Sequence, residues 1–196
     1  MFIRSVMVLW LLLGGSVFAD EPVDQKEILI IYSKSTHGAG QHRNTEVAHL
    51  IKQKIERSRY ASQFNVTLSY HAPKDKTIID RADLIIISSD GGTGHALMAE
   101  KKDAVTDMED LDARLKKNKA GLIVIHWATD SPKARNFSLT KTCEVNNPIM
   151  HRWIGAYYAW GNCRSWTEKF PIKDLAVNTS HPVGNGLPET FKMQDE

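Results

Sequence analysis

Short apolar runs alternate with polar, helix-like segments along the first two thirds of the chain. Three runs, residues 28–32, 84–87 and 122–125, are apolar throughout, which is typical of strands buried on both faces of a parallel sheet. A further segment, residues 64–68, alternates between apolar and polar residues and also predicts a strand. We therefore expect four strands, three of them buried on both faces.

The segments between these strands carry apolar residues at helical spacing. The spacing predicts helices at residues 44–59 and 98–117, and a short helix or turn at residues 78–83. Strands that alternate with helices over short connections are typical of a parallel α/β sheet. Further on the pattern weakens: residues 131–148 are polar and irregular, and residues 175–177 are the next candidate strand. With no internal repeat or linker, we expect one α/β domain.

The first 19 residues are predicted to be a secretory signal peptide and not part of the fold. Arg4 precedes an apolar run, Val6–Leu13, and small residues follow at the positions that a signal peptidase reads. The run is too short for a permanent membrane helix, although an uncleaved anchor is the alternative. Cleavage would release residues 20–196 as one exported domain, periplasmic or secreted, without stable membrane insertion.

Composition narrows the classes of partner. The chain has 25 basic and 23 acidic side chains, and this balance argues against nucleic acid binding, which requires a basic face. Two cysteines, Cys143 and Cys163, could form a disulfide in an oxidising compartment. The sequence leaves open whether they pair.

Histidines follow three of the four predicted strands. His37 and His42 follow the first strand, His95 follows the third, and His126 ends the fourth. The carboxyl ends of parallel strands meet at one edge of a sheet, where α/β proteins bind their ligands. We therefore expect these four side chains to converge on one crevice, close to Asp90 in the loop after the third strand.

Converging imidazoles support two kinds of chemistry. Neutral histidines are the commonest ligands of zinc and related metals, and three protein ligands plus a water form a catalytic site. Without a metal, the same side chains act as acid and base near neutral pH. Asp90 is expected either to bind the metal or to orient an imidazole.

Two other chemistries are disfavoured. A serine or cysteine nucleophile at a strand end requires glycines on both sides, whereas His126 lies between Ile125 and Trp127. Residues 33–40, after the first strand, are rich in hydroxyls and glycine, like the phosphate loop of a flavodoxin. That match is weak, and a flavin-binding electron carrier stays a minor alternative.

Five segments, in their order along the chain, resemble the ThuA-like (trehalose utilisation) family. They comprise residues 36–42, 88–95, 121–128, 153–158 and 181–188, and their order and spacing extend over nearly all of the expected mature chain. The resemblance implies a flavodoxin-like three-layer sandwich with a mostly parallel sheet, similar to class I glutamine amidotransferases. Those enzymes keep a cysteine where this chain has His126. Similar proteins continue further, so the resemblance implies either a fragment or a domain truncated at its carboxyl end.

The resemblance also implies a small-molecule carbohydrate partner, because the family is associated with disaccharide and keto-sugar metabolism. Isomerisation or hydrolysis of such a sugar requires proton transfer next to a carbonyl or acetal. The implied catalytic residues are His126 and His95, which polarise or deprotonate the substrate, and Asp90, which orients an imidazole.

Aromatic and histidine side chains are expected to contact the sugar, since aromatic rings stack on sugar faces. These implied substrate contacts are His37, His42, Trp127, Tyr157 and His181. A divalent metal such as zinc would be held by His37, His42, His95 and His126. A non-catalytic carbohydrate-binding or accessory domain is the alternative to an enzyme.

Overall fold

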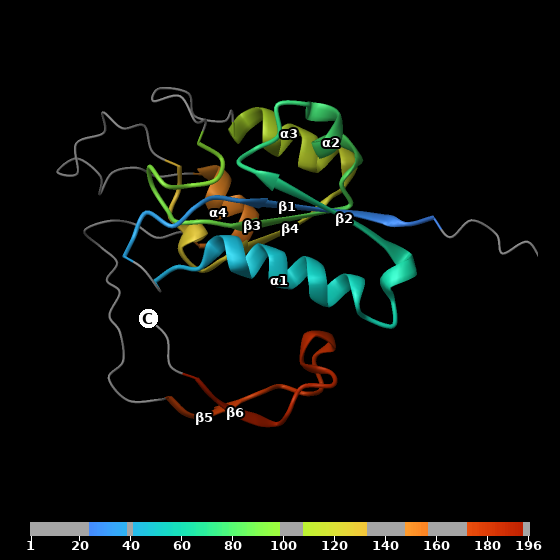
Figure 1. The fold of residues 1–196 in the computed structure, drawn as a ribbon, viewed down its shortest axis with the longest axis vertical. Helices are drawn as coiled ribbons and strands as arrows, with labels where there is room; N and C mark the ends of the chain where they lie inside the picture. The colour runs from blue at the N-terminus through green and yellow to red at the C-terminus, as the bar shows by residue number, and fades with distance from the viewer. Residues whose placement is uncertain (1–23, 39–40, 99–107, 133–147, 157–171, 194–196) are drawn as a thin grey trace, which may run out of the picture.

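The centre of the fold is a four-stranded parallel sheet. The computed structural model describes residues 24–38, 41–98, 108–132, 148–156 and 172–193. The strands are β1 (Lys26–Tyr32), β2 (Phe64–Tyr70), β3 (Leu84–Ser88) and β4 (Gly121–Ile125), in the spatial order β2-β1-β3-β4. All of their pairings are parallel, so every loop that follows a strand emerges at the same edge of the sheet (Figure 1).

Helices cover the two faces of this sheet. Figure 1 shows α1 (Asn44–Glu56) on one face and α2 (Lys76–Arg81), α3 (Met108–Asn118) and α4 (Pro148–Ile154) on the other. Alternate residues of each strand point to opposite faces. The sheet therefore contributes to two separate apolar cores, one on each side, and the arrangement is a three-layer α/β sandwich.

Odd-numbered residues of β1 and β3 belong to one core, and even-numbered residues belong to the other. Leu29 and Ile85 pack with Leu111 of α3 on one face. Ile30 and Ile86 pack with Ala48 of α1 on the other. Burial of a branched aliphatic side chain contributes about 2 kcal/mol, so the apolar runs that predict strands also supply most of the stability of the sheet.

β4 is an edge strand of the described sheet, whereas the sequence predicts a strand buried on both faces. The side chain of Ile123 is 47% exposed, in contrast to Ile86 on the neighbouring strand, which is 5% exposed. Ile123 pairs in register with Ile86, so the difference arises because α1 covers β3 and not β4. The prediction of a strand here is confirmed, and the prediction of two buried faces is wrong for the part of the chain that the structure describes.

The remaining described residues form a small antiparallel ribbon. Strands β5 (Ile172–Ala176) and β6 (Thr190–Met193) pair with each other, and the short 3-10 helix η4 (Pro182–Gly184) lies between them. In Figure 1 the ribbon lies apart from the four-stranded sheet, on the side of α1. The sequence predicts only part of β5 and gives no prediction for β6.

The helices predicted at residues 44–59 and 78–83 are present as α1 and α2, but α1 ends three residues earlier and α2 lies two residues earlier than predicted. The helix predicted at residues 98–117 ends within one residue of α3, but its predicted start is wrong. Met98 lies in a turn, with its N–H bonded to the carbonyl of His95 at 2.8 Å, and is not the start of a helix. Three sets of predictions lie outside the described residues: the signal peptide, the pairing of Cys143 with Cys163, and Tyr157. None of the described helices is long and apolar enough to cross a membrane.

Candidate functional site

Two loops at the carboxyl edge of the sheet bring three histidines together. His37 and His42 come from the loop after β1, and His126 begins the 3-10 helix η2 (His126–Thr129) directly after β4. The ring centroids of His37 and His42 are 4.0 Å apart, and those of His42 and His126 are 5.3 Å apart. The predicted convergence is therefore present for these three imidazoles.

Asp90, in the loop after β3, lies at the centre of this cluster. Its carboxylate accepts five hydrogen bonds from four residues. Oδ2 accepts from the backbone N–H of Thr36, from the Thr36 hydroxyl at 2.7 Å and from His37 Nδ1 at 3.1 Å. Oδ1 accepts from His42 Nδ1 at 2.7 Å and from Asn44 Nδ2 at 3.0 Å. One carboxylate thus fixes both imidazoles.

Asp90 is fully buried and nevertheless ionised. Burial alone would raise the pKa of this carboxyl, but hydrogen bonds from Thr36, Asn44 and His37 outweigh burial and hold the pKa well below its usual range. A buried charge is tolerated only where its hydrogen-bonding capacity is filled. The five donors meet that condition, so the site contains a permanent negative charge at neutral pH.

The bonds to Asp90 determine which nitrogen of each ring carries the proton. An ionised carboxylate only accepts hydrogen bonds, so His37 and His42 both donate from Nδ1–H. In a neutral imidazole held in this way, Nε2 carries the lone pair. The bonds to Asp90 therefore fix the orientation and the tautomer of both rings.

Trp127 packs against the imidazole pair. Its indole lies stacked on His42, with ring centroids 5.4 Å apart and planes at 30°, and its centroid is 6.0 Å from that of His37. The side chain of His37 is 42% exposed and that of His42 is 4% exposed. The cluster thus has a buried member, an accessible member and an aromatic wall.

The backbone at two of these histidines is held in a rarely adopted conformation. His42 has φ 43° and His126 has φ 53°, values in the left-handed region that residues other than glycine avoid. Such strain persists only where the surrounding structure enforces it, and it is concentrated at functional sites. The observation supports a functional role for this edge of the sheet.

Two glycines allow the loop after β3 to approach its neighbours closely. A Cβ at Gly91 would lie 2.3 Å from Cβ of Asp130, and one at Gly94 would lie 2.8 Å from Cγ2 of Thr36. Neither position has room for a side chain. The loop that carries Asp90 is therefore packed against both the β1 loop, with Thr36, and the segment after β4.

His95 lies apart from the cluster, which corrects the prediction that it is catalytic and a metal ligand. The residue is completely buried. Its Nε2 donates to the carbonyl of Ala128 at 3.0 Å, and its Nδ1 accepts from the backbone N–H of Leu97 at 3.1 Å. With both nitrogens bonded to backbone, the ring joins two loops beneath the site and has no nitrogen left for substrate or metal.

The buried His95 makes the protein less stable in acid. Burial, reinforced by the charge of His71 and opposed by the bond to Ala128, lowers the pKa of His95 from 6.5 to about 4. Between pH 6.5 and 4 the imidazole of His95 is protonated in the unfolded chain but not in the folded chain. The free energy of unfolding therefore falls as the pH drops over this range. We expect a loss of roughly 3 kcal/mol over that range, measured by urea unfolding.

His95→Gln is the matched variant for this measurement, because glutamine also offers a donor and an acceptor but does not titrate. The pH dependence between 6.5 and 4 should be largely absent in the variant. An equal dependence in both proteins would show that other groups cause it.

Two further predicted contacts have different outcomes. His181 is exposed and caps η4, where its Nδ1 accepts from the N–H of Val183 at 3.2 Å. Tyr157 lies outside the described residues. Conversely, sequence analysis missed Asn44 and the role of Thr36, which hold Asp90 in place.

The cluster has the composition of a metal site. His37, His42 and Asp90 each offer a ligand atom, and these atoms all lie within 4.8 Å of one another. The oxygens of Asp90 are already occupied by five donors, about as many as a carboxylate can accept. The donor set therefore fits a metal best where the imidazoles bind it and Asp90 orients them.

Comparison with known proteins supports the fold. No protein-family model matches the sequence, and no curated protein is significantly similar to it. The structure is similar to the crystal structure of a protein from Bacteroides uniformis that is described as ThuA-like, with a TM-score of 0.52 and 18% sequence identity. The similarity covers 92% of this chain and 62% of that protein, so this chain spans less than two thirds of its length. The chain therefore has the α/β fold of that ThuA-like protein.

Proposed function

We propose that this chain is an exported ThuA-like domain that acts on a sugar or keto-disaccharide at the cluster of His37, His42 and His126. The reaction is an isomerisation or hydrolysis, in which a proton is moved next to a carbonyl or acetal carbon. The partner is a small carbohydrate outside the cytoplasm, in the periplasm or the medium.

The observation that carries this proposal is that Asp90 accepts a hydrogen bond from each of two imidazoles. A histidine on the surface without a function does not require a buried carboxylate to orient it. A histidine that only fills space in the core does not require a second imidazole beside it. Here a buried, ionised carboxylate orients both rings through Nδ1. The same arrangement positions the general base in many enzymes, where the carboxylate fixes the tautomer and stabilises the protonated ring.

The three histidines differ in access, and this suggests different tasks. His37 is the most exposed member bound to Asp90, and it is suited to exchange a proton with a bound sugar. His42 is buried between Asp90, Trp127 and His126, and it is suited to hold the geometry of the cluster. His126, at the end of β4, would polarise the sugar carbonyl from the other side.

Trp127 gives a reason to favour a carbohydrate. Its indole lies alongside both imidazoles, so a pyranose ring resting on the indole would lie within reach of their nitrogens. Aromatic rings bind the apolar face of a sugar and leave its hydroxyls to polar neighbours. Binding and chemistry would then share one small surface.

A divalent ion such as zinc suits the same imidazoles. Bound there, it would polarise a carbonyl or supply a hydroxide near neutral pH. The ligands would be His37 and His42, with His126 as the third, and Asp90 would orient the first two. His95 is left out of this set because its nitrogens are bonded to backbone.

The test is turnover of a trehalose-derived keto-disaccharide by the purified chain, followed by proton NMR of the sugar. We expect conversion that falls at least about 100-fold in His126→Ala and in His37→Ala, since each removes a group that transfers or polarises at the reacting carbon. His151→Ala, an exposed histidine on α4, is the matched control and should keep full activity.

Two outcomes would contradict the proposal. Full activity in a folded His126→Ala protein would exclude this cluster as the reaction centre. Saturable sugar binding without turnover, with every variant losing affinity alone, would instead identify a carbohydrate-binding or accessory domain.

A further inference from the structure

A second site lies on the other side of the sheet from α1, between α3, β4 and α4. It is a pocket of about 450 Å³ that reaches Ala120, just before the amino end of β4, whereas the histidine cluster lies at the carboxyl edge. The lining residues are Asp112, Leu115, Lys116, Lys119, Ala120, Leu122, Arg152 and Trp153. Pockets of this size hold small organic molecules.

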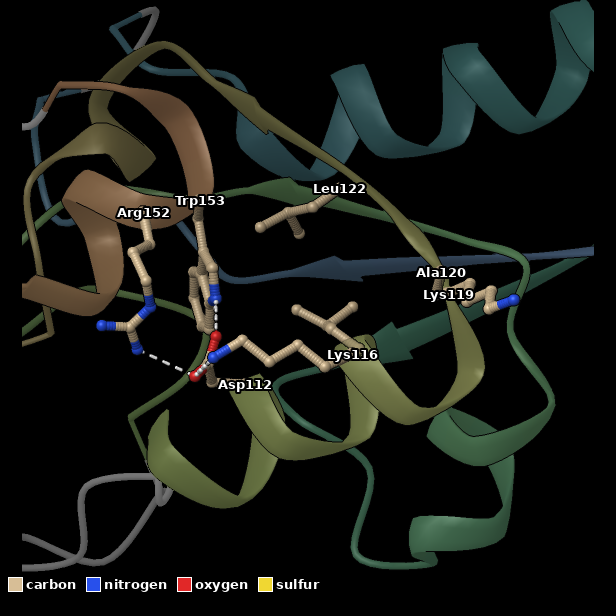
Figure 2. Close-up of a pocket in the computed structure, with 8 residues that line it drawn as sticks. Asp112, Lys116, Lys119, Ala120, Leu122, Arg152 and Trp153 are labelled. Carbon is tan, nitrogen blue, oxygen red and sulfur yellow. Dashed lines mark hydrogen bonds and ion pairs between the residues drawn. The ribbon is translucent and has the colours of Figure 1, made fainter.

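One end of the pocket is built around Asp112. Its carboxylate accepts from Lys116 Nζ at 2.7 Å, from Arg152 Nη2 at 2.8 Å and from the indole Nε1 of Trp153 at 2.9 Å. Figure 2 shows these three side chains pointing to Asp112 from two helices. Burial raises the pKa of Asp112, but these hydrogen bonds outweigh it and lower the pKa to about 2. The carboxylate is therefore ionised at neutral pH.

The pocket has more positive charge than this carboxylate can neutralise. Lys116, Lys119 and Arg152 face a single acidic side chain, Asp112, which leaves a surplus of two positive charges. A clamp that only joins α4 to α3 would require one cation. The excess indicates that the pocket attracts an anion.

The donors for such an anion are in place. In the described part of the chain Arg152 uses only Nη2, for Asp112, and the other guanidinium N–H groups have no protein acceptor. The ammonium of Lys119 makes no hydrogen bond or ion pair with any described residue. Guanidinium and ammonium groups are the usual ligands of carboxylate and phosphate.

The rest of the wall is apolar. Leu115, Ala120 and Leu122 line it, and the indole of Trp153 adds a flat face (Figure 2). A fully hydrated inorganic ion would leave this surface unused. An organic anion with a small ring would cover it and would be stabilised by the apolar surface removed from water.

We propose that this pocket binds a small organic anion, with a phosphate or carboxylate group at Arg152 and Lys116 and an apolar body against Leu122 and Trp153. Lys119, at the far end, adds to the attraction without direct contact to the charged group. The site is independent of the proposed sugar chemistry, because no residue belongs to both.

The experiment uses phenyl phosphate as the probe, titrated into the full chain and measured by calorimetry and by ¹⁵N–¹H NMR. The indole signal of Trp153, identified by its loss in Trp153→Phe, should shift with the same affinity that calorimetry gives. Inorganic phosphate should bind about tenfold more weakly, because it lacks the apolar body.

The decisive variants are Lys116→Gln and Lys117→Gln, which remove the same charge from adjacent exposed positions of α3. Only Lys116 lines the pocket. Lys116→Gln should weaken phenyl phosphate binding about tenfold, as expected for one charge-assisted hydrogen bond, and Lys117→Gln less than about twofold.

Three results would overturn the proposal. They are equal affinities in the two variants, an unmoved Trp153 signal at saturating probe, and inorganic phosphate binding as tightly as phenyl phosphate. Thermal unfolding checks that each variant is folded, and because the Lys116 side chain is 62% exposed we expect its replacement to be tolerated.

Discussion

Replacing Asp90 with asparagine should destabilise the protein by roughly 3 kcal/mol, although the two side chains have nearly the same shape. For a domain of this size the unfolding midpoint should fall by roughly 10 °C. Urea unfolding at neutral pH, followed by tryptophan fluorescence, measures the effect directly.

The reason lies in the number of donors that meet at this carboxylate. Donors approach both oxygens: Thr36 and His37 at Oδ2, and His42 and Asn44 at Oδ1. An asparagine has one oxygen and one NH₂ group. Whichever way the amide is turned, at least two donors then face another donor, and each unsatisfied buried group costs about 1–3 kcal/mol.

Asp75→Asn is the matched control for this substitution. Asp75 caps α2, and its Oδ1 accepts from both the N–H and the hydroxyl of Thr77. Asparagine caps a helix about as well as aspartate, so the same chemical change should alter stability there by less than about 0.5 kcal/mol. If Asp90→Asn is no more harmful than Asp75→Asn, the five hydrogen bonds do not hold the site as described.

The sequence was sufficient to predict the sheet and the edge at which the site forms. Uninterrupted apolar runs mark β1 and β3 because both faces of these central strands are covered, and the run at β4 marks a strand although one of its faces is partly exposed. Once those strands are parallel, the loops that carry His37, Asp90 and His126 must emerge together. This step needs no detail of side-chain packing, and it is why the cluster could be expected.

His95 shows where that argument ends. Topology assigns a side chain to an edge but does not say whether the loop turns outward or back into the core. Here the loop turns back at Gly94, and Ala96 and Leu97 after it are completely buried. Those apolar neighbours were a usable signal: an exposed catalytic loop seldom continues directly into buried aliphatic residues.

Asn44 and Thr36 could not have been identified in advance. Both are polar residues of ordinary type, one at the start of α1 and the other in a loop. Their importance comes from a distance to Asp90 that depends on how α1 and the β1 loop pack. Sequence distance and residue type carry no information on that packing.

The last expected result concerns zinc. We expect the purified chain to bind one equivalent near neutral pH, and His42→Ala to lower the affinity at least about 100-fold, because an imidazole ligand is lost. Asp90→Asn should lower it less, about 10- to 100-fold, which is the usual cost of removing a carboxylate that orients a ligand. Competition with a chromogenic chelator measures all three affinities.

His95→Gln separates the two possible sets of ligands. The sequence alone places His95 among the metal ligands, whereas the structure buries it with both nitrogens bonded to backbone. The variant should therefore bind zinc as the unaltered chain does.

The other outcomes would change the set of ligands. Loss of zinc binding in His95→Gln would support the ligand set inferred from the sequence. An equal loss of affinity in Asp90→Asn and His42→Ala would show that Asp90 is itself a ligand. Retention in all three would place any metal away from this edge of the sheet, and His37, His42 and His126 would then act by proton transfer alone.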